Sequence, residues 1–230
     1  MIKQSVSLLI AGITIGQTTV ALALGKYKPP RDNKPATGYT RSTGSRGECR
    51  QNTTIPLTLL APYTHVGQTT STHPFLAWYV PQGHSIPIQL SIYQKEANKR
   101  PLVVYQEELQ GSQGIMQASI PADRPGLQAG QRYIWEVAAI CNRDRPSTHI
   151  VASAEIDVIS KPKGDRSTLW YDVLKSSLNG NLEQGQLTRE SLDLLTQLAE
   201  LEKQAGTKGI KQGDRLMHIV LSGSHRVKHK

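Results

Sequence analysis

The sequence lacks the short motifs by which the common enzyme classes are recognised. It contains no G-x-S-x-G pattern, which positions an esterase serine, and no H-E-x-x-H pattern, which holds a hydrolytic zinc ion. It also contains no P-loop for nucleotide phosphates and no G-x-G-x-x-G pattern for a dinucleotide. No internal repeat is present either. We therefore predict a protein that is not an enzyme, with no catalytic, cofactor-binding or metal-binding residues.

Long apolar runs are missing after the first two dozen residues. The one candidate, VSLLIAGITIG, spans eleven residues and follows Lys3. It precedes ALA at 21–23, which has small residues at the two places that cleavage requires. This arrangement is typical of a secretory signal peptide cleaved after Ala23. The alternative is an uncleaved anchor, but the run is short for crossing about 30 Å of hydrocarbon. We expect residues 1–23 to be removed, and a secreted or periplasmic protein with no transmembrane segment.

Cysteine is scarce, since the chain holds only Cys49 and Cys141. Two cysteines in an oxidising compartment usually pair, so we predict a disulfide between them. Two buried free thiols are the alternative. Closing so long a loop stabilises a fold by about 4 kcal/mol in the chain-entropy model.

Neither basic end of the chain contains Trp or Phe, although the net charge is +9. Residues 24–50 carry seven Lys and Arg against two acids, and residues 206–230 carry six against one. Residues 51–205 carry 13 basic and 15 acidic side chains. A nucleic-acid domain would place its charge on a folded face with stacking aromatics, so no nucleic-acid partner is expected. The basic ends are solvated tails, or they contact anionic polymer or lipid head groups at a membrane surface.

Residues 24–54 are rich in Pro, Gly, Thr and basic side chains and poor in aliphatics. Such a segment buries too little apolar surface to offset its ordering entropy. We interpret it as a basic, flexible linker.

Residues 55–160 change to short apolar–polar alternations that Pro and Gly interrupt, with no helical period among them. This pattern predicts a β-sandwich domain of the immunoglobulin or fibronectin type III kind, built from seven antiparallel strands. The expected strands are 55–62, 73–81, 86–96, 101–110, 114–121, 132–141 and 149–160. The segments FLAWYVP and YIWEVAAICN also resemble strands of fibronectin type III modules.

The turn before the sixth predicted strand has the residues of a tyrosine corner. Leu127, Gly130 and Tyr133 match the motif, in which a Tyr near a strand start hydrogen-bonds back to the preceding chain. Gly130 permits a tight turn. Trp78 and Trp135 come from different strands and are the expected centre of the core.

Apolar residues recur at helical spacing after residue 161. Helices are predicted over 168–178 and 188–206, the second with Thr188 as N-cap. Together, residues 161–206 are expected to form an α-helical hairpin appended to the sandwich. Its leucine stripe packs either on the sandwich or on a partner's surface. Residues 207–230 are expected to be a basic tail.

Several segments occur in the order typical of one cyanobacterial family. They are LTLLAPYTHVGQTTSTHPFLAWYVP, GIMQASIP, GLQAGQRYIWEVAAICNRDRPS and LWYDVL. Over residues 47–200 the chain resembles domain-of-unknown-function family 928, which implies an exported cyanobacterial protein and supplies no activity. It departs from the family pattern at KPKGDRS, where a helix is expected, and after about residue 206.

The polar cluster that could bind a ligand follows Cys141. Arg143, Asp144 and Arg145 lie on a predicted connection between strands, where such folds place recognition loops. Alternatively, Asn142 and Asp144 shape a turn and the arginines are solvated. Residues 64–73 form a second predicted exposed loop.

The other polar candidates are expected to be satisfied or solvated. Glu107 and Glu108 are adjacent on a strand and face opposite sides, while Glu155 and Asp157 share a face that we expect to be solvated. His65, His73, His84 and His149 have no metal-ligand spacing.

These features favour a non-enzymatic interaction or accessory protein of the cell envelope, with an unknown protein or envelope polymer as partner. The first alternative is a binder of anionic polymer or lipid surfaces that uses the basic tails. The second is a hydrolase with an unfamiliar site.

Overall fold

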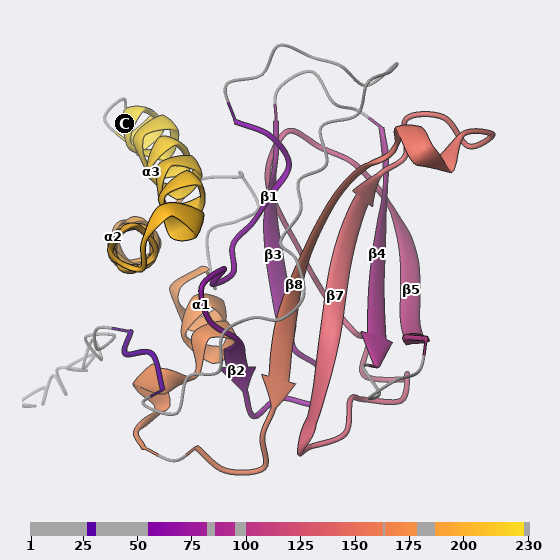
Figure 1. The fold of residues 1–230 in the computed structure, drawn as a ribbon, viewed down its shortest axis with the longest axis horizontal. Coiled ribbons are helices and arrows are strands. Elements are labelled where there is room, and N and C mark those ends of the chain that lie inside the picture. The colour runs from indigo at the N-terminus through magenta and orange to yellow at the C-terminus, as the bar shows by residue number, and fades with distance from the viewer. Residues whose placement is uncertain are drawn as a thin grey trace, which may run out of the picture.

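The computed structural model describes residues 27–30, 55–81, 86–94, 100–162, 164–178 and 187–227. These residues form a mainly β fold with two sheets and three α-helices (Figure 1). The strands are β1 (Thr58–Leu59), β2 (Gly67–Thr69), β3 (Phe75–Val80), β4 (Pro87–Gln94), β5 (Leu102–Gln110), β6 (Gly114–Ser119), β7 (Gln131–Ala139) and β8 (Ile150–Val158). The helices are α1 (Trp170–Leu178), α2 (Arg189–Gln204) and α3 (Thr207–Val227), with 3₁₀ turns at Pro146–Thr148 and Arg166–Thr168.

The strands divide into a three-stranded sheet, ordered β1-β3-β6, and a five-stranded sheet, ordered β2-β8-β7-β4-β5. All pairs are antiparallel except β2–β8, which is parallel. The prediction of seven antiparallel strands is therefore wrong at β2, which adds a parallel edge to the larger sheet. Its three residues are too few to show an alternation, and its pairing with β8 depends on tertiary contacts.

The expected exposed loop at 64–73 is also wrong, because His65, Val66 and Thr69 are buried. Gly67 in β2 lies directly against α1: a Cβ there would be 2.7 Å from Tyr171 Cε2. The segment therefore joins the larger sheet to the first helix.

The core forms between the sheets, as the strand alternation predicts. Trp78 on β3 and Trp135 on β7 come from different sheets, and both are fully buried. Tyr133 and Leu127 are buried as well. The Tyr133 hydroxyl accepts a hydrogen bond from Gln128 N at 2.9 Å, which is the contact of a tyrosine corner.

Gly130 makes the turn before Tyr133. It has φ of +85°, a backbone conformation that glycine adopts without steric cost, and its N–H donates to Val158 O at 2.7 Å. The corner thus ties the start of β7 to the end of β8.

Helix α1 is fixed to the sheets by three consecutive side chains of the LWYDVL segment. Trp170 Nε1 donates to Leu60 O, just after β1, at 2.9 Å. Tyr171 Oη accepts from Trp135 Nε1 on β7 at 2.8 Å, and Asp172 accepts from Thr69 Oγ1 on β2 at 2.6 Å. The segment thus connects α1 to both sheets.

Residues 207–227 form α3 rather than the predicted basic tail. The helix packs on α2 at two glycines: a Cβ at Gly209 would clash with Glu202 O, and one at Gly213 would lie 2.6 Å from Ala199 O. Leu216 and Ile219 are buried in the shared core. The two helices of the predicted hairpin form as α1 and α2, and α3 adds a third helix beside α2. All three contribute to the core that they share with the sheets, as the first of the two alternatives predicts.

The expected flexible linker over 24–54 is wrong at Tyr27, which is buried in the core. Its hydroxyl lies 2.7 Å from His65 Nε2, and its N–H donates to Gln197 Oε1 on α2 at 3.1 Å. This short N-terminal segment thus packs between the sheets and the helices.

Residues 1–23 and Cys49 lie outside the described residues, so the signal peptide and the Cys49–Cys141 disulfide stay predictions. Within the described ranges no cysteine is free, Cys141 included. No helix in the same ranges has the length and apolar character needed to cross a membrane.

Candidate functional site

The two sheets differ in width, with three strands in the smaller and five in the larger. The helices gather at the β2 side of the larger sheet, whereas β5 forms its far edge (Figure 1). Residues of the connection from β6 to β7 lie across a groove from β5.

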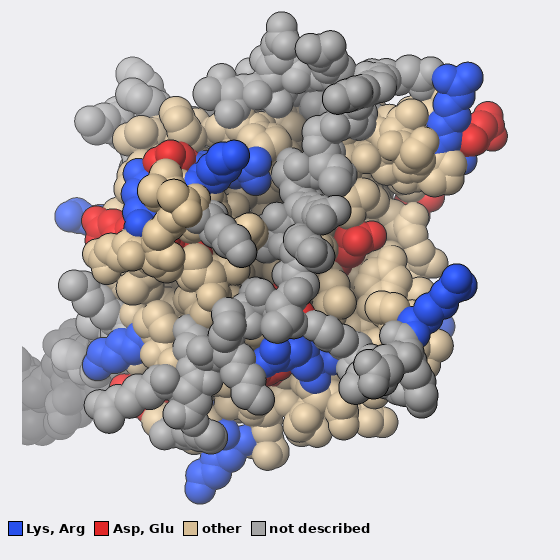
Figure 2. Space-filling model, in the orientation of Figure 1, with Lys and Arg blue, Asp and Glu red and all other residues tan. Residues whose placement is uncertain are grey.

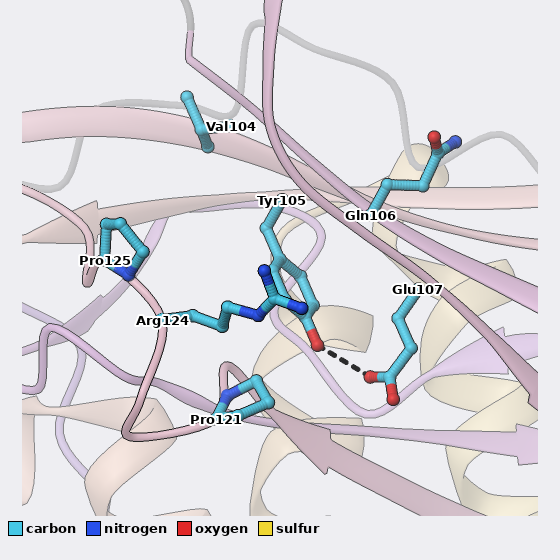
Figure 3. Close-up of a pocket in the computed structure, with 7 residues that line it drawn as sticks. All are labelled: Val104, Tyr105, Gln106, Glu107, Pro121, Arg124 and Pro125. Atoms are coloured by element: carbon cyan, nitrogen blue, oxygen red, sulfur yellow. Dashed lines mark hydrogen bonds between the residues drawn. The ribbon is translucent and has the colours of Figure 1, made fainter.

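A groove of about 370 Å³ lies between β5 and that connection (Figure 3). Its lining comes from two segments that are close in space but separated by a strand in sequence. The residues are Val104, Tyr105, Gln106 and Glu107 from β5, and Pro121, Arg124 and Pro125 from the connection. The volume lies within the range of ligand pockets, and the lining is about equally polar and apolar.

A β-bulge shapes the β5 wall of the groove. Tyr105 pairs with Ile92, but the next pair is Val103 with Tyr93, so Val104 is the extra residue. Bulges bend a strand locally and redirect side chains. After the bulge, the half-buried residues Tyr105 and Glu107 alternate with exposed ones. Before and at the bulge, the three apolar residues from Leu102 to Val104 are all exposed.

The polar groups of the groove form one hydrogen bond and leave a cation beside it. Tyr105 Oη donates to Glu107 Oε2 at 2.7 Å. Burial, followed by the bond to Glu107, raises the pKa of Tyr105 to about 12, while the charge of Arg124 opposes this shift. Figure 3 shows the exposed Arg124 side chain reaching from the connection toward Tyr105. The hydroxyl is thus a hydrogen-bond donor near neutral pH.

The connection from β7 to β8 carries the predicted binding residues, and the structure separates their roles. Arg143 forms a two-pronged ion pair with Glu108 on β5, at 3.0 and 2.5 Å. Asn142 Oδ1 accepts from Asp144 N at 2.9 Å, which is the turn that the alternative interpretation predicts. Arg145 is exposed. At this end of the molecule Figure 2 shows basic and acidic atoms next to each other.

The predicted opposite orientation of Glu107 and Glu108 agrees with these partners. Glu107 faces the groove, and Glu108 faces Arg143. They do not form a carboxylate pair, and neither Asp144 nor Arg145 lines the groove.

Three of the predicted histidines, His65, His73 and His149, have partners within the fold. His65 is buried against Tyr27, and burial lowers its pKa to about 4. His73 and His149 each have a ring nitrogen 3.1 Å from a backbone carbonyl, of Arg124 and Asn142 respectively. His84 lies outside the described residues. In the ranges that the structure describes, no group of three or more His, Cys, Asp or Glu could hold a metal ion.

The expected solvated face at Glu155 and Asp157 is wrong for Glu155, which is buried. Arg132 lies between the two carboxylates: its Nε donates to Asp157 Oδ1 at 2.6 Å, and its Nη1 is 3.5 Å from Glu155 Oε2. The bond to Asp157 is the main cause that raises the pKa of Arg132. This trio is an ion-pair cluster on the sheet.

Sequence reasoning missed the groove, because its walls meet only in the folded chain. One signal was present: the run Leu102–Val103–Val104 breaks the apolar–polar alternation of β5 at the bulge.

Comparison with known families finds one match. A family model described as Domain of Unknown Function (DUF928) matches residues 41–202, which confirms the resemblance indicated by the sequence segments. The matched range ends before α3. No curated protein and no solved structure matches the chain.

Proposed function

Since the chain belongs to the DUF928 family of domains of unknown function, we propose its function from its own groove. It is an exported, non-enzymatic interaction module of the cell envelope. It binds a carboxylate-bearing segment of a partner protein between β5 and the β6–β7 connection.

One observation carries this proposal: an exposed guanidinium lines a groove whose other walls combine apolar and polar side chains. Arg124 supplies the cation, and Val104, Pro121, Pro125 and the Tyr105 ring supply the apolar walls. A guanidinium binds a carboxylate through two parallel hydrogen bonds. Glu107 disfavours segments that carry only negative charge, because it places a carboxylate in the same groove.

The groove chemistry suits binding better than catalysis. A nucleophile needs a lowered pKa or an adjacent general base in the correct protonation state. The raised pKa of Tyr105 instead keeps its hydroxyl protonated, and it donates to Glu107. The lining therefore offers hydrogen bonds, a cation and apolar surface to a ligand.

Export is supported by the sequence pattern of residues 1–23, with a basic start, an apolar run and small residues before the expected cleavage point. Cell fractionation followed by N-terminal sequencing of the mature protein tests it. We expect Leu24 at the mature N-terminus and the protein outside the cytoplasm. An intact N-terminus in the cytoplasmic fraction would contradict export.

The binding proposal is tested by capture from envelope extract with the immobilised mature protein. Wild type, Arg124→Glu, Tyr105→Ala and Arg145→Glu are compared. Arg145→Glu is the matched control, since it reverses an exposed arginine outside the groove. We expect both groove variants to lose the captured protein by about tenfold or more, because a charged hydrogen bond contributes about 1.5–3 kcal/mol.

The opposite pattern would place the binding site elsewhere. Loss of capture in Arg145→Glu with retention in Arg124→Glu would assign binding to the β7–β8 connection. Turnover of a substrate by the purified protein would show that the module is an enzyme.

A second candidate rests on α3. Its outer face exposes Lys211 and His218 next to Ile210 and Leu221, a combination typical of helices that lie on anionic lipid surfaces. The expected result is binding to vesicles with anionic lipid that weakens as salt rises from about 50 to about 200 mM. Equal binding to neutral vesicles would contradict this function.

A further inference from the structure

The edge strand β5 exposes apolar side chains, and its outer edge pairs with no other strand among the residues that the structure describes. Leu102, Val103 and Val104 are 59%, 47% and 39% exposed. Strand β5 pairs with β4 on one side only and is the last strand in the sheet order. Exposed apolar groups beside free backbone N–H and C=O groups mark a site where another strand adds.

The charges along this strand are arranged so that it complements itself. A basic residue, Arg100, precedes the apolar triplet, and two acidic residues follow it. Of these, Glu107 accepts from Tyr105 and Glu108 also pairs with Arg143 in the same chain. When two such strands run antiparallel, the basic start of each lies opposite the acidic end of the other. The point midway between these charges falls at Val103 and Val104, which is also the centre of the exposed apolar surface.

We propose that a second copy of this chain covers this surface, with β5 antiparallel to β5 about a two-fold axis near Val103 and Val104. A two-fold contact uses the same patch on both copies, as a self-complementary strand requires. A register centred further along the strand would set Glu107 or Glu108 against its own copy, and like charges directly opposite are destabilising. The charges thus select the register that buries the apolar triplet.

The bulge at Val104 limits the strength of this contact. A bulge interrupts the regular ladder and increases the local twist, and Pro101 has no N–H to donate. The new ladder is therefore short, and the apolar triplet contributes most of the buried surface. Small interfaces of this kind are weak, so we expect a concentration-dependent dimer with a micromolar dissociation constant.

The arrangement also has a consequence for the groove. A two-fold axis normal to the sheet keeps the inner faces of both β5 strands on the same side. The two grooves then lie next to each other across the axis. The dimer contact shares Val104 and Glu107 with the groove lining. It needs no bound carboxylate, because the strand edge and the exposed apolar triplet form it.

Sedimentation velocity of the mature protein between about 1 and about 500 µM tests the proposal, a range that brackets micromolar affinities. Wild type is expected to shift from monomer to dimer, and Val103→Lys to remain monomeric throughout. Leu221→Lys is the matched control, because it charges an exposed leucine on α3 and should dimerise like wild type. A wild type that stays monomeric, or a Val103→Lys variant that dimerises equally, would overturn the proposal.

Charge reversal tests the register independently. Arg100→Glu makes both ends of β5 acidic, and Glu107→Lys with Glu108→Lys makes both ends basic. Each variant alone should be monomeric, and an equimolar mixture should form a heterodimer at least as tight as the wild-type dimer. Failure of the mixture to associate, with both variants folded by circular dichroism, would overturn the antiparallel register.

Hydrogen exchange of the wild type makes the same test without substitutions. Amides of β5 are expected to exchange more slowly at high than at low protein concentration. Exchange in β5 that does not depend on concentration would overturn the proposal.

Discussion

At the scale of single residues, the two tryptophans of the core differ in what their ring nitrogens contact. Trp135 Nε1 donates to Tyr171 Oη at 2.8 Å, whereas Trp78 Nε1 has no hydrogen-bond partner among the residues that the structure describes. Replacing either by Phe removes the same atoms, but Trp135→Phe also deprives the buried Tyr171 hydroxyl of its donor. We expect Trp135→Phe to cost about 1 kcal/mol more than Trp78→Phe. Urea unfolding of the two variants measures the difference, and equal costs would contradict the assignment.

His65 gives the fold a dependence on pH. Its folded pKa of about 4 lies below the ordinary value, since the side chain is buried. Between these values the unfolded chain binds a proton that the folded chain does not. The stability that neutral His65 contributes is therefore complete above about pH 6.5 and is lost as the pH falls toward 4, by about 3 kcal/mol in total.

The measurement is the free energy of unfolding of wild type and His65→Gln between about pH 7 and about pH 4.5. Wild type should lose more stability over this range than the variant. The comparison is needed because burial raises the pKa of Glu202. A raised carboxyl pKa makes the free energy of unfolding change with pH in the opposite direction to His65. His218→Gln changes an exposed histidine and should keep the wild-type slope. Parallel curves for wild type and His65→Gln would contradict the prediction.

At the scale of elements, one substitution distinguishes a packed α3 from a solvated tail, because the sign of its effect on the free energy of unfolding differs between the two. Alanine favours an exposed helix over glycine by about 1 kcal/mol, so Gly209→Ala would stabilise a free helix and leave a disordered tail unchanged. In the packed helix the new Cβ would clash with Glu202 O. We expect Gly209→Ala to destabilise the protein by about 2 kcal/mol or more, within the range for overpacked cores.

Thermal unfolding of Gly209→Ala and Gly164→Ala measures this effect. Gly164 is the control, because the nearest atom to an added Cβ, on Thr168, would be 3.8 Å away. Its variant should unfold like wild type. A Gly209→Ala protein that is as stable as wild type would show that α3 does not pack on α2 in solution.

Elements with a strong local pattern could be predicted from sequence, and those defined by close packing could not. Strands β3, β4, β7 and β8 follow from alternation, and α2 follows from its N-cap and leucine spacing. Strand β2 is too short to alternate. In α3 the contact surface uses Gly209 and Gly213, which lower helix propensity and lack apolar character, so the segment was predicted to be a tail.

The candidate site shows the same division. Trp78, Trp135 and the corner around Tyr133 are where the sequence predicts them, because each depends on neighbours in its own strand or turn. The groove depends on the difference in width between two sheets and on where the β6–β7 connection crosses β5. Neither property is encoded in a local pattern.

At the scale of the whole molecule, the described helices pack at the β2 side of the larger sheet, and β5 forms its other edge (Figure 1). The core extends past β2 into the three helices. Tyr27 is buried in it and contacts both His65 and Gln197 of α2. Polar contacts fix this side: Glu202 Oε1 accepts from Tyr63 N at 2.8 Å, and Gln212 Nε2 donates to Leu59 O at 3.2 Å. The groove lies at the opposite edge, beside β5.

The predicted disulfide would connect the N-terminal segment to this body. Cys141 follows β7, a strand in the middle of the larger sheet, so a bond from Cys49 would restrain a long loop against the core. The mature protein, denatured without reductant, should take up no thiol reagent, and after reduction it should take up two equivalents. Reduction should lower the free energy of unfolding by up to about 4 kcal/mol, and the Cys49→Ser/Cys141→Ser variant should match the reduced protein. Labelling of both cysteines without reductant would show that the N-terminal segment is held by packing around Tyr27 alone.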